Sequence, residues 1–450
     1  MKSKIVTSTL DEPLDTDELP EGWKVVTILD ACEVNPPKPP KDFLLADAPV
    51  TFVPMPAVDA DLGAITNPDI KPYLEVRNGF TSFRDGDVIM AKITPCMENG
   101  KAAIVQGMKN GIGFGSTEFH VMRSRGEILP EYLYYFIRQK SFRKEAESHF
   151  TGSVGQKRVP ADFIKHCVIP LPPLADQQRI VTRVEELLTH VNTARDRLSR
   201  VLVIMKKFRQ ATLAAAYTGR LTEGWSGDQG SDQFSFNRDE IEGNGYNFKI
   251  PVTWQLENIK GVCEMIVDCP HSTPLWTQNG EICLRTTNFK PGYLDLSEVR
   301  FVSHDTYLER ISRLEPHEND IVYSREGGIL GIACIIPKGL KTCLGQRMML
   351  LRVDQTRSNP KFILNFLNSP VILKNVKELT GGTSSPHLNV ADVKKFHIPL
   401  PPLAEQHEIV RRVGLLFERA DAFDREVAAA SLRCERLTQA VLGKAFAGRL

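Results

Sequence analysis

The sequence predicts an α+β fold in which two globular α/β domains lie at opposite ends of a long antiparallel two-helix coiled coil, as a pseudo-two-fold internal repeat. Three observations predict this fold: phrases that occur twice in the same order, a heptad pattern of apolar residues in each half, and a polar segment between the halves. A chain of 450 residues is also too long for one typical domain, so several units are expected.

The internal repeat determines how the whole chain is organised. Three pairs of phrases match: LPEGW (19–23) with IPVTW (250–254), IPLPPLADQQRIV (169–181) with IPLPPLAEQHEIV (398–410), and RQATLAAAYTGRL (209–221) with TQAVLGKAFAGRL (438–450). The middle pair is identical at 10 of 13 positions, and the last two pairs are each separated by 229 residues. We therefore interpret the chain as a duplication, in which each half is a globular part followed by a helix.

Each predicted helix carries apolar residues at alternating steps of three and four over about four heptads, which is the pattern of a coiled-coil seam. The residues expected on the seam are Ile180, Val184, Leu187, Val191, Leu198, Met205 and Phe208 in the first helix, and Ile409, Val413, Leu416, Phe423, Val427 and Leu437 in the second. Asp176 and Glu405 fall in the first turns, where negative charge suits the helix dipole. A single amphipathic helix packed on a globular core would show a 3.6-residue period instead, so the pattern favours the coiled coil.

The segment 222–245 is rich in Gly, Asp, Ser, Asn and Gln and predicts a solvated linker. A helix of some 42 residues is roughly 60 Å long, and the linker would span that distance only if almost fully extended. Antiparallel pairing removes this demand. The expected organisation is a first globular domain (1–170), a first helix (171–221), the linker (222–245), a second globular domain (246–398) and a second helix (399–450).

Composition is that of a soluble globular protein, with 42% apolar and 25% charged residues and a net charge of +1. This balance excludes neither a nucleic-acid partner nor a small molecule, so only local charge can decide. The sequence has no apolar run long enough for a transmembrane helix and opens without the apolar core of a secretory signal, so we expect a cytoplasmic protein with no membrane contact. The nine cysteines include no C-x-x-C pair, so we expect reduced, mostly buried thiols and no metal site.

The sequence also gives little support for catalysis. NPPK at 35–38 resembles the Asn-Pro-Pro-aromatic motif of adenine methyltransferases, but Lys38 replaces the aromatic residue that would stack on the flipped base. No Gly-rich turn after a strand precedes it to hold a methyl donor, and no G-x-x-x-x-G-K-[ST] phosphate loop occurs. We therefore expect a non-catalytic chain.

The globular parts do offer basic and polar residues at loops that occupy equivalent places in the two halves. FRDGDVIMAK leads to Lys92 and its counterpart leads to Arg325, while GFGSTEFHVMR matches CLGQRMMLLR. The candidate DNA-binding residues are Lys92, Lys101, Ser116, Thr117, Arg123, Lys157, Arg158, Arg285, Arg325, Gln346, Arg347, Ser384, Ser385 and His387. Equivalent loops with different side chains are expected of two DNA-reading surfaces of one design, because Arg suits guanine, Gln suits adenine, and Lys suits phosphate.

The two LPPLA-[DE]-Q phrases, each leading into a heptad helix that ends in GRL, resemble the specificity subunit of type I restriction-modification enzymes. The resemblance covers the whole chain. It implies two target recognition domains that each read one half of a split, asymmetric double-stranded DNA site. It also implies helices that set the gap between the halves and dock two methyltransferase subunits, which restriction subunits join. S-adenosylmethionine, ATP and Mg would belong to those partners, and this chain would bind no cofactor.

Residue identity is kept at the helix ends and lost in the middles, so we hypothesise that the ends contact an external partner. The candidate docking residues are Gln177, Gln210, Arg220, Gln406, Gln439 and Arg449. Two alternatives remain open. A scaffold that spaces two protein partners would explain the coiled coil but not the matched basic loops, and a self-sufficient modification enzyme would need the missing methyl-donor loop.

Overall fold

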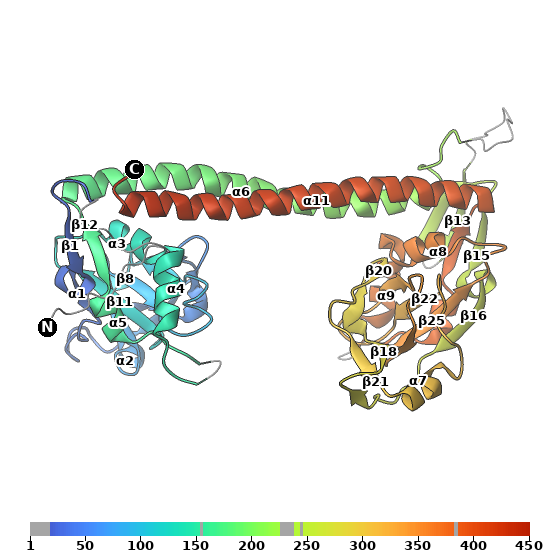
Figure 1. Cartoon of the computed structure of the whole chain (residues 1–450), viewed down its shortest axis with the longest axis horizontal. Coiled ribbons are helices and arrows are strands. Elements are labelled where there is room, and N and C mark those ends of the chain that lie inside the picture. Colours follow the sequence, from blue (N-terminus) through green and yellow to red (C-terminus); the bar gives the residue numbers. More distant parts are fainter. Residues whose placement is uncertain (1–18, 154–155, 226–237, 244–245, 382–385) are drawn as a thin grey trace. The chain divides into compact units, whose positions relative to one another are not determined.

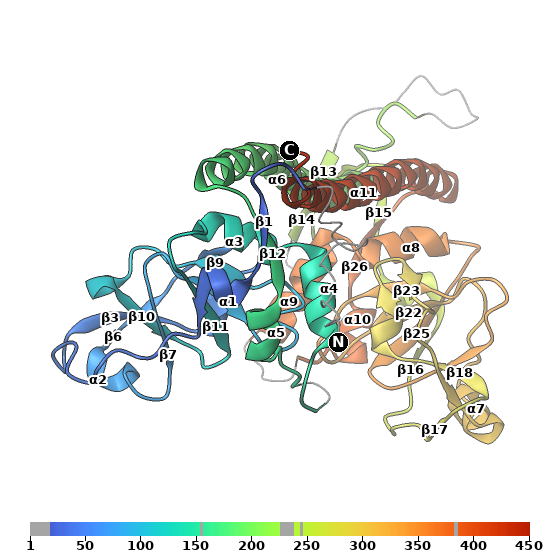
Figure 2. The same ribbon diagram turned by 60° about the vertical axis from the view of Figure 1, so that its left-hand side comes forward.

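The structure, a computed structural model, describes residues 19–153, 156–225, 238–243, 246–381 and 386–450. The chain divides into two compact units: unit 1 contains the residues up to Leu198 together with Ala428–Leu450, and unit 2 is Ser199–Val427. Each unit therefore combines one globular part with pieces of both long helices, α6 (Leu174–Ala216) and α11 (Leu403–Phe446) (Figures 1 and 2). Two long helices follow the duplicated phrases, as the heptad pattern predicts.

The globular part of unit 1 is a mixed α/β structure. Its elements are β1 (Lys24–Thr27), α1 (Ile28–Ala31), β2 (Cys32–Val34), β3 (Pro49–Val53), η2 (Met55–Ala57), β4 (Val58–Asp59), β5 (Ala64–Ile65), β6 (Asp69–Pro72), α2 (Tyr73–Val76), β7 (Thr81–Arg84), β8 (Val88–Ala91), β9 (Ala102–Ile104), η3 (Lys109–Gly111), β10 (Ile112–Gly115), β11 (Phe119–Ser124), α3 (Pro130–Ile137), α4 (Lys140–Ser148), α5 (Ala161–His166) and β12 (Val168–Leu171).

Two four-stranded sheets make up most of this unit, with strand orders β6-β3-β10-β7 and β2-β11-β8-β9. The central strand β8 has the sequence VIMA and is buried along its whole length, as a strand covered on both faces should be. β10 pairs in parallel with β3 and antiparallel with β7. Thr27 and Asp30 form a capping box that starts the short helix α1 directly after β1.

The globular part of unit 2 has the same kinds of element. They are β13 (Arg238–Gly243), β14 (Tyr246–Pro251), β15 (Gln255–Asn258), η4 (Ile259–Val262), β16 (Cys263–Asp268), β17 (Trp276–Thr277), β18 (Glu281–Leu284), η5 (Thr286–Asn288), β19 (Phe289–Lys290), β20 (Tyr293–Leu294), β21 (Arg300–Val302), α7 (His304–Ile311), β22 (Ile321–Ser324), β23 (Ala333–Ile335), β24 (Thr342–Leu344), β25 (Met348–Val353), α8 (Pro360–Leu367), α9 (Pro370–Thr380), α10 (Val390–Lys394) and β26 (His397–Leu400).

The topology of unit 2 repeats that of unit 1. The sheet β16-β25-β22-β23 has the order of β2-β11-β8-β9, and β24 pairs in parallel with β18 as β10 does with β3. The repeat seen in the sequence is therefore a repeat of the fold. Loops that follow equivalent strands can be compared directly between the two units.

A two-stranded antiparallel stem joins each globular part to its helix. In unit 1, β1 pairs with β12 from Lys24↔Leu171 to Thr27↔Val168. In unit 2, β15 pairs with β26 from Gln255↔Leu400 to Asn258↔His397. The chain thus enters and leaves each globular part at neighbouring positions.

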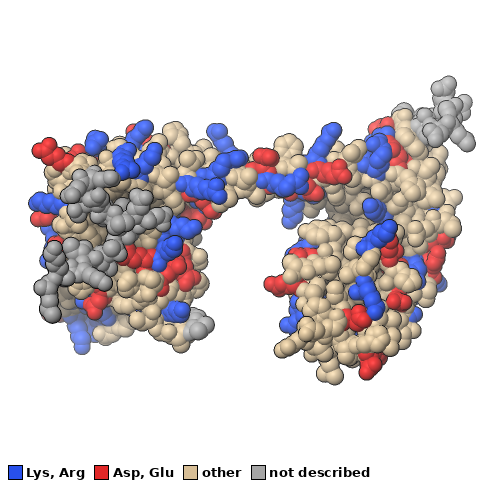
Figure 3. All heavy atoms as spheres, viewed as in Figure 1, with Lys and Arg blue, Asp and Glu red and all other residues tan. Residues whose placement is uncertain are grey.

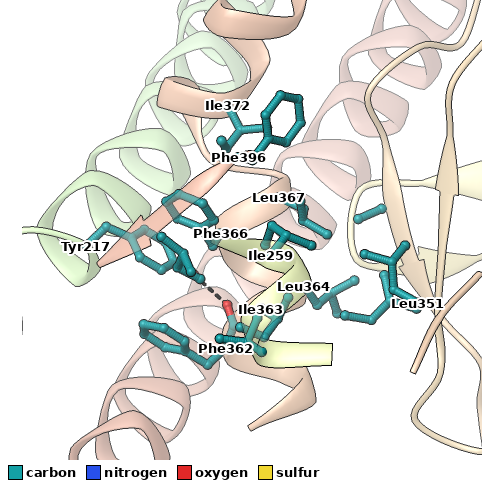
Figure 4. Packing of buried hydrophobic residues seen from close by; sticks show 14 of the residues in the cluster. Tyr217, Ile259, Leu351, Phe362, Ile363, Leu364, Phe366, Leu367, Ile372 and Phe396 are labelled. Carbon is teal, nitrogen blue, oxygen red and sulfur yellow. Dashed lines mark hydrogen bonds between the residues drawn. The ribbon is translucent and has the colours of Figure 1, made fainter. Parts of the chain in front are cut away.

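In each unit, an aromatic residue at the end of one long helix packs against the globular part. In unit 2, Tyr217 lies against Phe362 and Phe366 of α8, with ring centroids 5.2 and 4.8 Å apart, and its hydroxyl donates to the Phe362 carbonyl at 2.8 Å (Figure 4). In unit 1, Phe446 lies in the same way against Tyr132 and Phe136 of α3, at 4.8 and 5.4 Å. These contacts join the helix ends to the main hydrophobic core of each unit.

Within unit 2 the two helix segments run in opposite directions. Arg209 binds Asp421 and Asp424, while Leu213, closer to the end of α6, shares the core with Ile409 and Val413, closer to the start of α11. In unit 1, the start of α6 shares the core with the end of α11. The antiparallel course predicted from the linker length is therefore seen within each unit.

Most of the predicted seam residues are buried or half-buried, but two are not. Phe423 and Leu437 are 58% and 54% exposed, so their assignment to the seam was wrong. Asp424 turns inward instead and binds Arg209 at 2.9 Å, and half-buried Thr438 replaces Leu437. A seam with alternating steps of three and four residues can pass through either Phe423 or Asp424. The apolar pattern favoured Phe423, whereas the ion pair with Arg209 places Asp424 on the inner side.

The segment 222–245, predicted as a solvated linker, includes a described strand. β13 pairs with β14 from Arg238↔Pro251 to Gly243↔Tyr246, so that part of the segment is not irregular. Composition shows only that the segment is polar. The backbone N–H and C=O groups of a polar segment can form hydrogen bonds with a neighbouring strand as well as with water, so polarity does not exclude a strand. Residues 226–237 and 244–245 of the predicted linker lie outside the described residues.

All nine cysteines are free, and seven of them are buried, as the sequence predicts for reduced thiols. In the described part of the chain, no helix combines the length and the apolar character that crossing a membrane requires.

Candidate nucleic-acid interface

Four loops of unit 2 meet around Arg325. They follow β16, follow β22, connect β24 with β25, and precede α10. Arg325 is the residue after β22, and its side chain is only 2% exposed. Its backbone N–H donates to the Arg347 carbonyl at 3.0 Å, and its own carbonyl accepts from Leu388 at 2.8 Å. One residue therefore connects three of the loops through its backbone.

The Arg325 side chain joins the fourth loop. Its Nε and Nη2 donate to both carboxylate oxygens of Asp268, at 2.8 and 3.0 Å, and its Nη1 lies 2.9 Å from Glu326. Two histidines complete the cluster: His271 lies 3.2 Å from Asp268, and His387 lies 3.2 Å from Glu326. Arg325 was predicted to contact DNA, but its guanidinium is committed to two carboxylates. Its role in the structure is to hold the loops together.

Hydrogen bonds from α7 and from the loop's own Gln346 hold the loop between β24 and β25 in place. Buried Arg310 of α7 donates to the carbonyls of Leu344 (2.8 Å), Gly345 and Ser272. The Gln346 amide donates to the His271 carbonyl, and its oxygen accepts from Thr273 at 3.3 Å. These bonds tie this loop to the loop after β16. Gln346 is therefore an organising residue as well as a candidate reader.

Arg347 is the exposed basic residue of this group. Its backbone has a φ of 69°, a conformation that non-glycine residues adopt at a cost of about 1–3 kcal/mol and that is common at functional sites. Its guanidinium lies over Gly327, 3.3 Å from where a Cβ would stand. Among the described residues no hydrogen bond or ion pair engages its side chain. Arg347 is free to make the two-point contact with guanine that Arg favours.

The equivalent loops of unit 1 meet in the same way but carry other side chains. Lys92 follows β8, donates through its backbone to Glu118, and accepts from Val159 at 2.9 Å. Arg158 binds both carboxylate oxygens of Glu118, at 2.9 and 3.0 Å, and this bond holds the pKa of the carboxyl below its usual value. Lys157 is exposed beside this pair, and its carbonyl accepts from Thr94. The structure thus brings together the predicted residues Lys92, Lys157 and Arg158.

Ser116 and Thr117 stand in the short connection between β10 and β11, next to Glu118. The Ser116 hydroxyl accepts from the Glu118 backbone at 3.2 Å, and Thr117 is exposed. The strand register places Ser116, Thr117 and Glu118 where Gly345, Gln346 and Arg347 stand in unit 2, so the sequence match of Ser116 and Thr117 with Gln346 and Arg347 was one residue out of register. The two connections therefore present different chemistry from the same position, as expected of surfaces with different sequence preferences.

The NPPK motif has an internal role in the fold. The Asn35 oxygen accepts from the Val121 backbone at 3.0 Å, and its nitrogen lies 3.1 Å from the His120 ring. His120 is buried, its other ring nitrogen lies 2.9 Å from the Val159 carbonyl, and burial lowers its pKa. The motif therefore anchors the loop after β2.

Three predicted residues lie elsewhere. Lys101 donates to the Met55 carbonyl at 3.1 Å, and Arg285 is half-buried at the start of η5. Arg123 binds both oxygens of Asp87 at 2.8 Å, at the start of β8 and so at the opposite end from Lys92. Unit 2 repeats that pair as Arg352 with Asp320, so Arg123 belongs to the shared fold and its assignment as a reader is corrected.

Two further predictions, Ser384 and Ser385, lie outside the described residues. His387, from the same loop, belongs to the Arg325 cluster. Asp268 and His271 of that cluster were not predicted. Asp268 is 57 positions from Arg325, so no local signal links the two residues.

The candidate docking residues require a larger correction. Gln177 and Gln406, from the duplicated phrase, are both 0% exposed. Gln177 bonds to the Leu129 N–H and to the Glu127 and Pro172 carbonyls, all at 2.8 Å. Gln406 makes the matching bonds in unit 2, to Asn359, Arg357 and Pro401. Both glutamines attach a helix start to its own globular part and cannot face a partner.

The other docking candidates differ in exposure. The Gln439 oxygen accepts from the Lys140 backbone at 2.6 Å and so also has an internal role. Gln210, Arg220 and Arg449 are exposed.

The duplicated GRL and P-x-x-W phrases contact each other. Gly219 adopts a φ of 70° against Pro251 and Trp254, and Gly448 adopts a φ of 66° against Pro20 and Trp23. The end of each long helix therefore packs against the P-x-x-W phrase of the unit in which that helix ends. In unit 2, Glu405 accepts from Trp254 Nε1 at 3.0 Å and from Thr222 at 2.7 Å, while burial raises its pKa. Packing within the chain therefore accounts for the kept phrases.

Basic and acidic side chains are interspersed over the face of the molecule seen in Figure 3. The near-neutral net charge is therefore not a sum of one basic and one acidic block on that face.

Comparison with known proteins identifies the family. The model of the type I restriction modification DNA specificity domain matches residues 20–201 and 251–421. The chain is 27% identical to the Escherichia coli EcoAI specificity subunit over 89% of this chain and 78% of that protein, and 32% identical to the EcoBI subunit over 67% and 62%.

Two solved structures share the fold. One is a chain of a type I R-M system studied for its assembly and conformational transition, with a TM-score of 0.72, 24% identity and coverage of 96% and 99%. The other is the HsdS subunit of Thermoanaerobacter tengcongensis, with a TM-score of 0.50, 22% identity and coverage of 96% and 98%. The chain, with its two matched segments, belongs to the family of type I restriction modification DNA specificity domains.

Proposed function

We propose that this chain is the DNA sequence-specificity subunit of a type I restriction-modification complex and recognises an asymmetric bipartite double-stranded site. One observation carries the proposal: the same fold occurs twice and presents different side chains at the same loops. Thr117, Glu118 and Arg158 stand in unit 1 where Gln346, Arg347 and His387 stand in unit 2. Each unit then reads one half-site, and the two half-sites differ.

In unit 2, the side chains of Arg347, Gln346 and His387 contact the DNA bases. Arg325 holds the loops that carry them. In unit 1 the exposed residues Thr117 and Lys157 and the half-buried Ser116 and Lys92 face the DNA. Lysine contacts position the duplex through phosphates, and the short polar side chains contact base edges.

We also propose that α6 and α11 form one continuous antiparallel coiled coil with pseudo-two-fold symmetry, which sets the gap between the half-sites. Deleting one heptad from each helix in register should shorten it by about 10 Å and the gap by roughly three base pairs. An unchanged gap would contradict this role.

The two methyltransferase subunits dock on the outer faces of the helices, and restriction subunits join through them. Leu202, Val203 and Ile204 support this, because three consecutive apolar side chains are exposed on α6. S-adenosylmethionine, ATP and Mg are expected on those partners and none on this chain, and the complex is expected in the cytoplasm.

The deciding experiment is to map methylated adenines in the source genome with and without this gene. A split motif with a fixed gap that disappears on deletion supports the proposal and gives both half-sites. A methylome that does not change, together with random DNA binding by the assembled complex, would favour a spacing scaffold instead.

A further inference from the structure

Unit 2 contains an open hollow of about 310 Å³ that is separate from the loops around Arg325. It is lined by Asn258, Lys260, Ala391, Lys394, Lys395 and His397. Three of these residues are lysines, and the lining includes no carboxylate. We refer to it as the basic hollow.

The backbone that carries these lysines is firmly held. Ile259 and Phe396 are buried in the core of unit 2 (Figure 4), and the Ile259 N–H donates to the Phe396 carbonyl at 2.9 Å. Lys260 follows Ile259, and Lys395 precedes Phe396. Asn258 and His397, which are paired partners at the end of the β15–β26 stem, also line the hollow. The hollow is therefore part of the fixed fold.

The positive charge of the hollow exceeds the negative charge beside it. Across the described ranges, no hydrogen bond or ion pair engages the side-chain nitrogen of Lys260, Lys394 or Lys395. Of the two carboxylates that adjoin the lining in sequence, Glu257 is paired with Arg357 at 3.2 Å, while Asp392 accepts from the neutral Asn389 amide at 3.1 Å and keeps its charge, so one negative charge stands beside three positive ones. Three like charges around one hollow repel one another, so an anion bound there would be stabilised.

The shared fold does not require this charge. The equivalent corner of unit 1 also has a capped turn after its stem strand, and Ile28 donates to Cys167 as Ile259 does to Phe396. There the turn carries Leu29 and Asp30, and Lys165 lies 3.4 Å from Asp162. At the described positions of unit 1 that match Lys260, Lys394 and Lys395 stand Leu29, Lys165 and His166, so unit 1 has one lysine where unit 2 has three.

We propose that the basic hollow binds a backbone phosphate of the DNA beside the half-site that unit 2 reads. This inference rests on the proposed function. Helix α10 connects the hollow to the loop of His387, and its five residues rise about 7 Å, which is the rise of two nucleotides along one DNA strand. A duplex engaged at the reading loops therefore has a phosphate within reach.

The chemistry of the lining favours phosphate over a protein surface. Lysine acts as a point charge toward phosphate, whereas protein interfaces depend on aromatic and arginine anchors. The lining offers only Ala391 as an apolar side chain. Such a contact carries no base information, so it raises affinity for any sequence.

The test uses the full chain assembled with its methyltransferase partner and a duplex that carries the mapped motif, beside the same duplex with scrambled half-sites. The variant is Lys260→Gln with Lys395→Gln. The matched control is Lys338→Gln with Lys361→Gln, two exposed lysines elsewhere in unit 2. Affinity is measured between 50 and 200 mM salt.

The variant loses one phosphate contact, so the slope of log affinity against log salt should become about 0.9 less steep, and the loss of affinity between 50 and 200 mM salt should be about 3.5-fold smaller than in the parent. The change should be the same on both duplexes, and the methylated motif should not change. A slope equal to that of the parent or of the control would overturn the proposal. So would a defect in complex assembly without DNA, because the hollow would then face an acidic protein. Absence of any motif would instead refute the proposed function.

Discussion

Arg325 and Asp268 form a two-point ion pair, at 2.8 and 3.0 Å, in which the arginine is almost fully buried. The pair joins the loop after β22 to the loop after β16, and Glu326 and the two histidines extend it. The basic residue at the end of β22 therefore supports the loops, and Arg347 and His387, which those loops carry, are exposed.

Arg325→Ala should lower the free energy of unfolding by about 3 kcal/mol, because it leaves Asp268 and Glu326 partly buried without their partner. Urea unfolding of the full chain measures this loss. A variant as stable as the parent would show that the ion pair does not hold the loops.

Arg347→Ala is the matched change on the exposed side of the same loops. Stability should stay within about 0.5 kcal/mol of the parent, while discrimination at one base of one half-site falls by about 1–3 kcal/mol. Methylation mapping should then show one relaxed position. If Arg347→Lys, which keeps the charge but not the two-point geometry, preserved full discrimination, the guanine-type contact would be excluded.

Gly219→Ala and Gly448→Ala should each cost about 2–4 kcal/mol, because the new Cβ would overlap the Pro251 or Pro20 ring at a positive φ. Gly224→Ala is the control, since Gly224 also has a positive φ but faces open space, and it should cost about 1 kcal/mol. Thermal unfolding compares the three. Equal losses would mean that strain alone, without the contact to proline, explains the glycines.

Gln406→Ala should cost about 3 kcal/mol, because three hydrogen bonds of a fully buried amide are lost at once. Gln210→Ala, at an exposed glutamine of α6, should change stability by less than about 0.5 kcal/mol. Loss of methyltransferase binding by Gln406→Ala with unchanged stability would restore the docking hypothesis for this residue.

Thr222→Val should make stability more dependent on pH. Burial raises the pKa of Glu405, so the folded state holds a proton that the unfolded chain releases. Stability from this group is therefore greatest below its ordinary value of 4.5 and declines as pH rises above it. Removing the Thr222 donor should raise the pKa further, with a loss of about 2 kcal/mol at pH 8 and less at pH 5.

Thr218→Val is the control for this prediction, because the Thr218 hydroxyl donates to the neutral Ala214 carbonyl. Its effect on the melting temperature should be the same at both pH values. If Thr222→Val behaved identically, Glu405 would not be the group responsible.

The helices and the duplicated fold were predictable because their signals are periodic and local. Apolar spacing in α6 and α11 places both helices within a few residues of their observed ends. Strand pairing and the aromatic contacts of Tyr217 and Phe446 depend on residues far apart in sequence, so no window of sequence shows them.

The candidate site was harder to predict for two physical reasons. A residue that is identical in both repeats has a role in both, but identity does not show whether that role is a contact within the chain or with a partner. Gln177 was misassigned for this reason. A basic side chain at a strand end is equally compatible with solvent, DNA or a distant carboxylate. Arg123, Arg325 and Arg347 look alike in sequence, and only the positions of Asp87 and Asp268 separate them.

The paired stems have an evolutionary consequence. Because β1 lies beside β12, and β15 beside β26, a globular part can be exchanged for a foreign one through two neighbouring junctions. A graft succeeds if it preserves the backbone that receives Gln177 or Gln406 and the aromatic pair that receives Phe446 or Tyr217. A new recognition sequence can therefore arise by recombination that replaces one globular part, while the long helices and the other globular part stay unchanged.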